Sequence, residues 1–263
     1  MKKIIALVLA ALMLCSCLTA CGNKPATLDS VKKAGKLTIA TSPDFPPFEN
    51  LENGEVVGIE VEIMKLICKE LGVEMELKQI NFDSVLPGVQ AAKFNVGMSG
   101  ISVTPEREKN VKFSIPYCEA AQAIVVVEGS EIKAKADLTG KKISVQSGTT
   151  AEDFCNTSGY EVSSFAANGD ARDALVSGKV AAWVIDDLTA AEMVAAYNAT
   201  NPEKKLVVLE EPMTTEPYAF AFHLESADLA DEVSKIIQKL LDDGTIAKIF
   251  ADANVPYTAP ASK

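Results

Sequence analysis

Short apolar stretches alternate with longer segments of helical periodicity along most of the chain. Strands are predicted where apolar residues run together or alternate, at 37–41, 73–77, 96–101, 123–127, 143–145, 181–185 and 206–209. Apolar residues recurring three or four positions apart predict helices at 59–71, 83–89, 150–155, 170–176, 188–197 and 229–241. This alternation predicts an α/β protein built on mostly parallel sheets. Such sheets bind ligands beyond the carboxyl ends of their strands.

The first twenty residues have a different pattern. Two lysines precede an unbroken apolar run at 4–14, which is shorter than the about 20 residues of a membrane-spanning helix and typical of a signal-peptide core. The run leads into Leu18-Thr19-Ala20-Cys21-Gly22, which resembles the lipobox of bacterial lipoproteins. We therefore expect residues 1–20 to be a lipoprotein signal peptide and Cys21 to be lipidated. The alternative is an ordinary secretory signal cleaved nearby.

Charge and cysteine content exclude several classes of function. The 263 residues carry 25 Lys and Arg against 36 Asp and Glu, so a nucleic-acid partner is not expected. A single histidine and the lack of paired CxxC spacing argue against a metal site, and we expect no cofactor. Beyond the leader, Cys68, Cys118 and Cys155 are interpreted as small buried side chains. A disulfide from Cys155 to Cys68 or Cys118 is the alternative.

Two segments that follow predicted strands could bind an anion. Thr104 and Pro105 favour a helix start, which puts Arg107 in the first turn. A cation there is unfavourable by about 0.3–1 kcal/mol unless an anion meets it; the alternative is a surface arginine screened by adjacent glutamates. Thr149 and Glu152 fit a capping box, which already explains both residues. The same Gly-Thr-Thr turn can also present backbone N–H groups to a small anion.

Groups that suit a cation follow other strands. Asp186 and Asp187 come directly after 181–185, so one is expected to cap the next helix and the other to meet a cation. The Ser102 hydroxyl and the Gly100 carbonyl offer further oxygen acceptors. Combined with the anion-binding segments, these groups match both charged ends of an amino acid through strong charge-assisted hydrogen bonds. Apolar walls for its side chain are available from Phe45 and Phe82.

Eight segments, in order over about residues 35–250, have distinctive sequences. They are SPDFPPFE at 42–49, GIEVEI at 58–63, FDSVLP at 82–87, GISVTPER at 100–107, FSIPY at 113–117, DLTGK at 137–141, QSGTT at 146–150 and EPMTTEPY at 211–218. Together they resemble the extracytoplasmic solute-binding proteins (family 3) of polar amino-acid ABC transporters. Each segment alone is modest evidence, but eight in order are specific to the family.

The resemblance implies a two-lobed α/β fold of the periplasmic-binding-protein type II, with the ligand clamped in a cleft between the lobes. Two crossover strands are expected near 117–122 and 211–215. Lobe 1 is then 31–120 with 216–263, and lobe 2 is 121–215. Residues 21–30, which follow the signal peptide, are predicted to be a tether between membrane and lobe 1.

The resemblance also assigns roles to individual residues. Phe45 and Phe82 are expected to wall the ligand side chain. Gly100, Ser102 and Asp186 are expected to hold the α-ammonium. The guanidinium of Arg107 is expected to bind the α-carboxylate, with help from Ser102 and the amides of Thr149 and Thr150.

Specificity for the ligand side chain is left open between glutamine-like and basic ligands. Gln146 lies where relatives contact the side chain, and it can both donate and accept. Ser42 stands where several relatives place an aspartate, which argues against a strictly basic ligand. Asp44 or Glu49 could replace that missing carboxylate.

The expected function is capture of a polar L-amino acid by hinge closure and its delivery to the membrane subunits of an ABC importer. We expect a monomer that is lipid-anchored on the extracytoplasmic side of the cell membrane, in the periplasm or on the outer face. One alternative is a cleft enzyme of the cyclohexadienyl dehydratase type, with Asp44 or Glu49 as the general acid. Another is a ligand sensor for a separate receptor.

Overall fold

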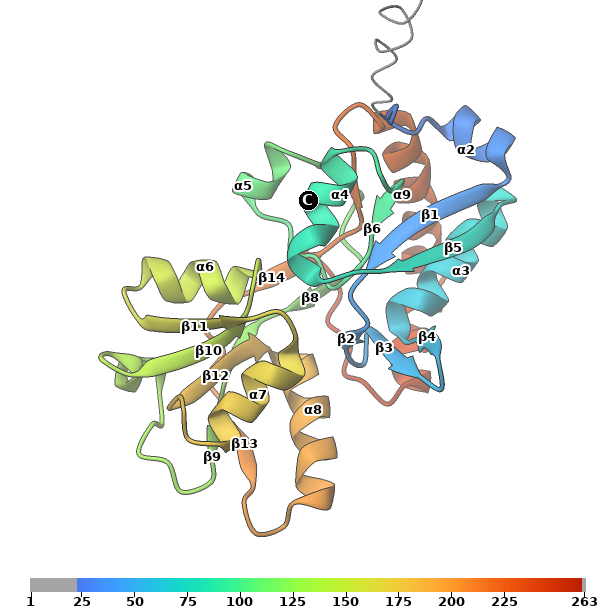
Figure 1. Ribbon diagram of the computed structural model, residues 1–263. Coiled ribbons are helices and arrows are strands. Elements are labelled where there is room, and N and C mark those ends of the chain that lie inside the picture. Colours follow the sequence, from blue (N-terminus) through green and yellow to red (C-terminus); the bar gives the residue numbers. More distant parts are fainter. Residues whose placement is uncertain (1–22, 262–263) are drawn as a thin grey trace, which may run out of the picture.

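Two lobes, each built around a five-stranded sheet, make up residues 23–261, the part of the chain that the computed structural model describes (Figure 1). The predicted signal peptide, residues 1–20, and the predicted lipid-bearing Cys21 lie outside these residues. No helix in the described part is both long and apolar enough to cross a membrane.

The first lobe holds the sheet with strand order β5-β1-β6-β15-β7. Its strands are β1 (Lys36–Thr41), β5 (Glu74–Gln79), β6 (Val96–Gly97), β7 (Lys112–Phe113) and β15 (Ala221–Phe222). A small sheet beside it consists of β2 (Asp44–Phe45), β3 (Glu49–Glu52) and β4 (Glu55–Val57). The helices are α2 (Leu28–Ala34), α3 (Ile59–Leu71), α4 (Val85–Gln90), α5 (Pro105–Glu108), α9 (Ala227–Asp242) and α10 (Thr245–Asp252), with a 3₁₀ turn at Phe82–Ser84.

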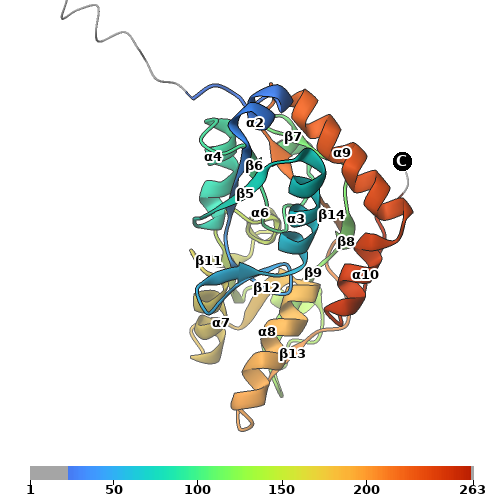
Figure 2. The same ribbon diagram turned by 90° about the vertical axis from the view of Figure 1, so that its right-hand side faces the viewer.

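The second lobe repeats this plan with strand order β11-β10-β12-β9-β13. Its strands are β9 (Gln122–Val127), β10 (Lys142–Gln146), β11 (Glu161–Phe165), β12 (Ala182–Asp186) and β13 (Leu206–Val208). Its helices are α6 (Thr150–Thr157), α7 (Asn168–Val176) and α8 (Asp187–Thr200), with a 3₁₀ turn at Lys135–Leu138. Viewed from the side, the second lobe lies directly below the first (Figure 2).

Both sheets contain one reversed strand among the described residues. In the first sheet β15 is antiparallel to β6 and β7, whereas β1 is parallel to β5 and β6. In the second, β9 is antiparallel to β12 and β13, and β10 is parallel to β11 and β12. The predicted mostly parallel sheets are therefore found, but each has a reversed strand. Each reversed strand comes just after the chain has crossed from the other lobe.

The two lobes are joined by a pair of antiparallel strands, β8 (Cys118–Ala120) and β14 (Glu216–Tyr218). β8 lies within the first predicted crossover, 117–122. β14 begins one residue after the second, 211–215. The segment before β14 still bonds to the second lobe, since the Met213 N–H donates to the Gln122 carbonyl at 2.7 Å. Pairing with β8 therefore starts only at Glu216.

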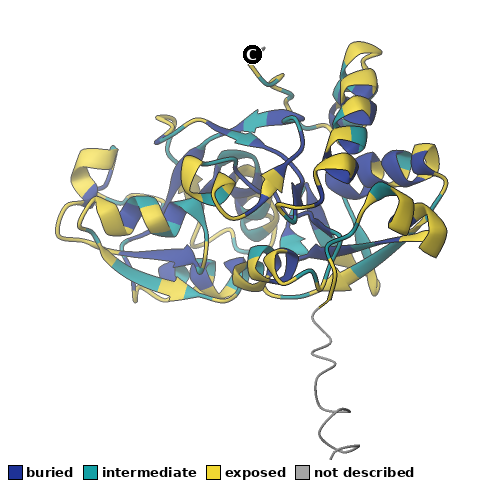
Figure 3. Ribbon diagram, turned by 90° about the horizontal axis from the view of Figure 1, so that it is seen from above, coloured by how far each residue is buried: buried dark blue, intermediate teal, exposed yellow. Residues whose placement is uncertain are grey.

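Helix α3 shows how the apolar pattern produces the fold. Ile59, Ile63 and Ile67 recur every four residues, are at most 1% exposed, and each contributes about 1.5–3 kcal/mol by burial. Gly72 ends the helix in the left-handed conformation, φ +72°, as its position predicted. The dark blue ribbon of Figure 3 shows buried residues concentrated in the sheets and on the inner faces of the helices.

Two sequence expectations need correction. The predicted tether at 21–30 is too long, because α2 begins at Leu28. Its N–H donates to Asp228 Oδ2 of α9 at 2.9 Å, and the Thr27 side chain caps the helix. The predicted strand at 96–101 ends at Gly97, because at Gly100 the backbone turns to φ +52°, which a strand does not accommodate.

The three cysteines of the described chain, Cys68, Cys118 and Cys155, are buried and unpaired. Neither alternative disulfide is formed. Burial raises the pKa of Cys68 to about 11 and that of Cys155 to about 12. Burial also raises the pKa of Cys118 well above its ordinary value, so all three remain thiols and pack as small apolar side chains, as the sequence indicated.

Replacement of Gly58, the residue before α3, should strongly destabilise the fold. At φ +136° an added Cβ would lie 2.2 Å from the Phe48 carbonyl oxygen. We expect Gly58→Ala to lower the free energy of unfolding by about 2–4 kcal/mol, measured by urea denaturation. Gly72→Ala is the matched control: it also has positive φ, but nothing lies within 4 Å of the added Cβ, so the loss should be about 1 kcal/mol. Equal losses in the two variants would contradict the steric argument.

Candidate functional site

A narrow cavity lies between the lobes. Its lining comes from strand ends and loops of both sheets, as expected for an α/β fold. All nine residues that the sequence suggested as ligand contacts are part of it, and the tenth is Ser99. The lining consists of Phe45, Phe82, Ser99, Gly100, Ser102 and Arg107 from the first lobe, and of Gln146, Thr149, Thr150 and Asp186 from the second.

The apolar side of the cavity is formed by two phenylalanines. The Phe45 ring stacks on Phe48 with a centroid distance of 5.7 Å. It also covers Gly100, where an added Cβ would lie 2.4 Å from Phe45 Cε1. The positive φ and this close approach both require glycine at position 100. Phe82 opens the 3₁₀ turn before α4, and its ring centroid lies 5.8 Å from the Arg107 guanidinium carbon.

Arg107 brings a positive charge to the cavity. The Thr104 hydroxyl caps α5 by accepting from the Arg107 N–H at 3.2 Å, as the sequence predicted. The guanidinium donates from Nη1 to the Ser102 carbonyl and from Nη2 to the Gly148 carbonyl of the other lobe, each at 3.0 Å. Glu106, one of the adjacent glutamates that could have screened Arg107, instead pairs with Lys109.

No carboxylate within residues 23–261 forms a salt bridge with this guanidinium. Burial lowers the pKa of Arg107, while the charges of Glu216, Asp153 and Asp186 act in the opposite direction. A guanidinium stays protonated throughout the physiological range. Arg107 therefore brings a full positive charge, without a paired anion, to the wall of the cavity.

The N-terminus of α6 meets the same cavity from the second lobe. The Thr149 hydroxyl accepts from the Glu152 N–H at 3.2 Å, and Glu152 Oε2 accepts from the Gly148 N–H at 2.7 Å. The predicted cap is thus formed, with the glutamate bonded one residue earlier than in a standard capping box. The first N–H groups of a helix have no partner within it, so this turn can bind an anion.

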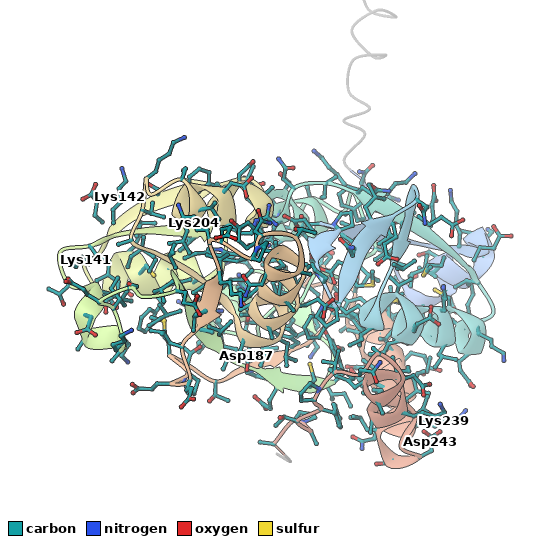
Figure 4. The ribbon with its side chains drawn as sticks, turned by 90° about the horizontal axis from the view of Figure 1, so that it is seen from below. Lys141, Lys142, Asp187, Lys204, Lys239 and Asp243 are labelled. Carbon is teal, nitrogen blue, oxygen red and sulfur yellow. The ribbon has the colours of Figure 1, made fainter. Side chains whose placement is uncertain are left out.

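Asp186 supplies a carboxyl at the carboxyl end of β12. Its side chain is 6% exposed, accepts from Gln122 Nε2 at 2.8 Å and also accepts from the Tyr218 hydroxyl. Burial and the nearby Glu216 charge raise its pKa to about 7. The neighbouring Asp187, labelled in Figure 4, instead accepts from the backbone N–H groups of Leu188 and Ala121 at 2.8 and 3.3 Å. Asp187 thus stabilises the helix start, and Asp186 faces the cavity.

A network of hydrogen bonds fixes the amide of Gln146. Its Nε2 donates to Asp44 Oδ2 and to the Ala166 carbonyl, both at 3.2 Å, and its Oε1 accepts from Asn168 Nδ2 at 3.0 Å. The opposite placement of the amide would set an oxygen against the Asp44 carboxylate. Both N–H groups are used, so Gln146 has only an oxygen lone pair left for a partner in the cavity.

The three residues suggested as side-chain contacts, Ser42, Asp44 and Glu49, do not line the cavity. The Ser42 hydroxyl donates to Asp44 at 3.0 Å. Asp44 also accepts from the Asn168 N–H of the second lobe at 2.8 Å. Glu49 is fully buried behind Ser99, whose hydroxyl donates to it at 2.7 Å. The sequence did not predict Ser99 as a cavity residue. Only its position directly before the segment GISVTPER at 100–107 could have pointed to it.

The sequence profile of the bacterial extracellular solute-binding proteins, family 3, matches residues 37–252. The chain belongs to this family. The resemblance inferred from the eight segments is thereby confirmed, and the family consists of extracellular proteins. Lipidation at Cys21 lies outside what the family match tests and stays a prediction.

Individual relatives cover most of the chain. The arginine-binding extracellular protein ArtP of Bacillus subtilis (strain 168) is 31% identical over 95% of this chain and 96% of its own length. A mutant of ArgBP from T. maritima has a TM-score of 0.79 at 35% identity, over 86% of this chain and 97% of that one. An ancestral arginine-binding protein bound to glutamine has a TM-score of 0.76 at 37% identity, over 83% and 97%. These likenesses confirm the two-lobed type II fold.

The raised pKa of Asp186 predicts a pH-dependent stability in the ligand-free protein. The stabilisation from its protonated form is fully present below the ordinary value of 3.8 and is lost as pH rises through about 7. Between about pH 5 and about pH 8, this residue should account for a loss of about 2–3 kcal/mol in the free energy of unfolding. Denaturant titrations at both pH values should therefore show a smaller loss in Asp186→Asn.

Asp173→Asn serves as the control, because the Asp173 side chain is 63% exposed. It should keep the wild-type dependence on pH. The same pH dependence in Asp186→Asn as in the wild type would show that Asp186 is ionised in the folded protein at neutral pH.

Proposed function

We propose that this protein captures a polar L-amino acid by closing its two lobes and delivers it to the membrane subunits of an ABC importer. The observation that carries the proposal is the pairing of charges across one cavity. The Arg107 guanidinium, with no salt bridge inside the described chain, lies on one side and the Asp186 carboxyl on another. An amino acid complements both groups.

The α-carboxylate would bind to Arg107 and to the N-terminus of α6. A guanidinium binds a carboxylate through two parallel N–H groups, and the N–H groups of Thr149 and Thr150 add donors from the opposite lobe. The α-ammonium would bind to Asp186, the Gly100 carbonyl and the Ser102 hydroxyl. Because an adjacent cation favours the ionised carboxyl, the bound ammonium would ionise Asp186.

The end of the cavity at Gln146 favours a ligand side chain that donates hydrogen bonds. Gln146 presents an oxygen, and the negative Asp44 lies directly behind its amide. A guanidinium or an amide NH₂ group suits this end, whereas a carboxylate would meet only acceptors. ArtP and ArgBP are arginine-binding proteins, and an ancestral arginine-binding protein has been solved with glutamine. We therefore propose arginine as the preferred ligand and glutamine as a weaker one.

Closure of the lobes would complete the site. Arg107 bonds to Gly148 and Asp44 bonds to Asn168, and both bonds connect the first lobe to the second. Thr150 Oγ1 donates to Glu216 Oε2 of the crossover strand at 2.6 Å. A ligand that contacts both lobes shifts the population toward the closed form. Closure around the charged ends also excludes water and strengthens the ionic contacts.

We propose that Cys21 is lipidated and holds the protein at the outer side of the cell membrane, as a monomer. Stable anchoring takes more than one acyl chain, which a lipoprotein modification supplies. We also propose that the two lobes divide at about residues 120 and 216. A role as a ligand sensor for a separate receptor would use the same closure.

The cleft-enzyme alternative has less support. It required Asp44 or Glu49 as a general acid in the cleft, and neither side chain lines the cavity. Asp44 already accepts hydrogen bonds from three side-chain or backbone donors. The relatives described above are named as binding proteins.

Calorimetric titration with the twenty amino acids tests this function. We expect one-to-one binding of arginine, weaker binding of glutamine and no binding of glutamate. Arg107→Ala should weaken arginine binding by at least about 100-fold, because it leaves a buried carboxylate unpaired. The melting temperature of the ligand-free protein should barely change.

Lys109→Ala is the control, since it removes a cation just beyond α5 whose side chain is 66% exposed. It should bind arginine like the wild type. Normal affinity in Arg107→Ala would remove Arg107 from its role, and an empty panel would contradict amino-acid capture.

The contact between Asp44 and α7 should affect affinity through closure. The N-cap residue of α7, Ala167, has no capping side chain, and Asp44 of the other lobe accepts the first helical N–H. Loss of a cap costs about 0.5–2 kcal/mol, so Asp44→Ala should weaken arginine binding by about tenfold. Asp44→Asn, which keeps a capping oxygen, should recover part of the loss. Unchanged affinity in Asp44→Ala, measured by the same titration, would show that this bond does not contribute to closure.

A further inference from the structure

Two carboxyl groups lie side by side in the interior of the first lobe. Glu49 of β3 and Glu60 of α3 are each 0% exposed, and they accept hydrogen bonds from the adjacent residues Ser99 and Gly100, respectively. Neither lines the cavity described above. Acidic side chains are almost never fully buried unless they are paired, so this pair needs a physical explanation.

Not every one of the four carboxyl oxygens of Glu49 and Glu60 has a hydrogen-bond donor. Glu49 Oε1 accepts from the Ser99 hydroxyl at 2.7 Å. Glu60 Oε1 accepts from the Tyr117 hydroxyl, and Glu60 Oε2 accepts from the Gly100 N–H at 3.0 Å. Glu49 Oε2 is buried without a donor from any other residue in the described chain. Two ionised carboxylates only accept hydrogen bonds and repel one another, so a proton on one of them removes the repulsion and turns an oxygen without a donor into a donor.

The surroundings place this proton on Glu49 and the charge on Glu60. Burial, followed by the charge of Glu60, raises the pKa of Glu49 well above its ordinary value, and Asp44 acts in the same direction. Burial also raises the pKa of Glu60, but hydrogen bonds from Glu49, Tyr117 and Gly100 oppose it. Glu60 further lies in the first turn of α3, where the helix dipole favours a negative charge.

The remaining titratable neighbours do not supply a compensating cation. Tyr117 and Cys118, next to the pair, are fully buried, and burial raises the pKa of each well above its ordinary value. Both are neutral at physiological pH. No lysine, arginine or histidine within residues 23–261 forms a salt bridge with Glu49 or Glu60. A single shared proton is therefore what makes the burial of both groups tolerable.

We propose that Glu49 and Glu60 hold one proton between them at neutral pH and act as positioning residues for the ammonium side of the binding site. The link to the ammonium rests on the proposed function, whereas the shared proton does not.

The pair acts through two residues that line the cavity. Glu60 accepts the Gly100 N–H, and because a trans peptide is planar, this bond fixes the orientation of the Ser99–Gly100 peptide, which leads into the Gly100 carbonyl assigned to the ammonium. The Ser99 hydroxyl is held from both sides, since it donates to Glu49 and accepts from the Ser42 N–H at 3.1 Å. The charge on Glu60 also lies one hydrogen bond behind Gly100, where it attracts a bound ammonium.

Infrared spectroscopy of the ligand-free protein tests the proton directly. We expect the carbonyl stretching band of a protonated carboxylic acid at neutral pH. This band should persist in Asp186→Asn, which removes the other carboxyl with a strongly raised pKa. In the Asp186→Asn background, where Asp186 no longer contributes, it should be lost when Glu49→Gln is added, because the amide replaces the protonated acid and can donate to Glu60 in its place.

Arginine titrations of the paired variants test the positioning role. Glu49→Gln preserves the single negative charge and the donor to Glu60, so its affinity should stay within about threefold of the wild type. Glu60→Gln removes the charge and exchanges a charged acceptor for a neutral one, so its affinity should fall by about tenfold. An Asp186→Asn/Glu49→Gln variant that still shows the acid band, or an Asp186→Asn variant that lacks it, would overturn the shared proton.

Failure of the positioning role and failure of the proposed function would give different results. Equal affinities of the wild type and Glu60→Gln, with the acid band present, would overturn the positioning role and leave amino-acid binding intact. An empty ligand panel would overturn the proposed function, while the infrared result for the ligand-free protein would still stand.

Discussion

The site between the two lobes depends on ionisable side chains that are buried away from water. An arginine and an aspartate meet at one cavity, and neither is neutralised by the other. Arg107 is held by the Ser102 and Gly148 carbonyls, while Asp186 accepts from Gln122 and Tyr218. Hydrogen bonds from neutral groups hold both side chains in position, and the raised pKa of Asp186 means that a bound cation would favour its ionised form. Such an arrangement favours a ligand that brings its own opposite charges.

The first lobe is rigid where it meets this cavity. Gly100 lies under the Phe45 ring with no room for a Cβ, and its N–H is fixed to a carboxyl buried behind it. The second lobe contributes groups at the ends of its strands and at the start of α6. Contacts across the gap, such as Asp44 to Asn168, form only when the lobes are together. In the proposed mechanism, closure of the lobes forms these contacts, and affinity would depend on the position of the lobes.

Much of the site could be inferred from residue types next to predicted strand ends. Thr149 and Asp186 follow two strands of the second sheet and Arg107 follows β6 of the first, and the ligand site of an α/β fold lies beyond such strand ends. The environment of each side chain could not be inferred in this way. Asp44 and Glu49 were expected to be near a ligand, but Asp44 bridges the lobes and Glu49 lies behind Ser99. A few residues of sequence separation do not tell which side of a loop faces a cavity.

The sequence alone determined the main alternation of strands and helices, the family and nine of the ten residues that line the cavity, because local periodicity and motif spacing are recorded along the chain. Only the tertiary structure decided which strand is reversed in each sheet and that β8 pairs with β14. It also brought Glu49 and Glu60 together in the interior, and gave Asp186 its raised pKa. These properties depend on desolvation and on contacts between residues far apart in the chain, such as Asp186 with Tyr218 or Tyr117 with Glu60. No local pattern encodes how much water a folded chain excludes from a carboxyl group.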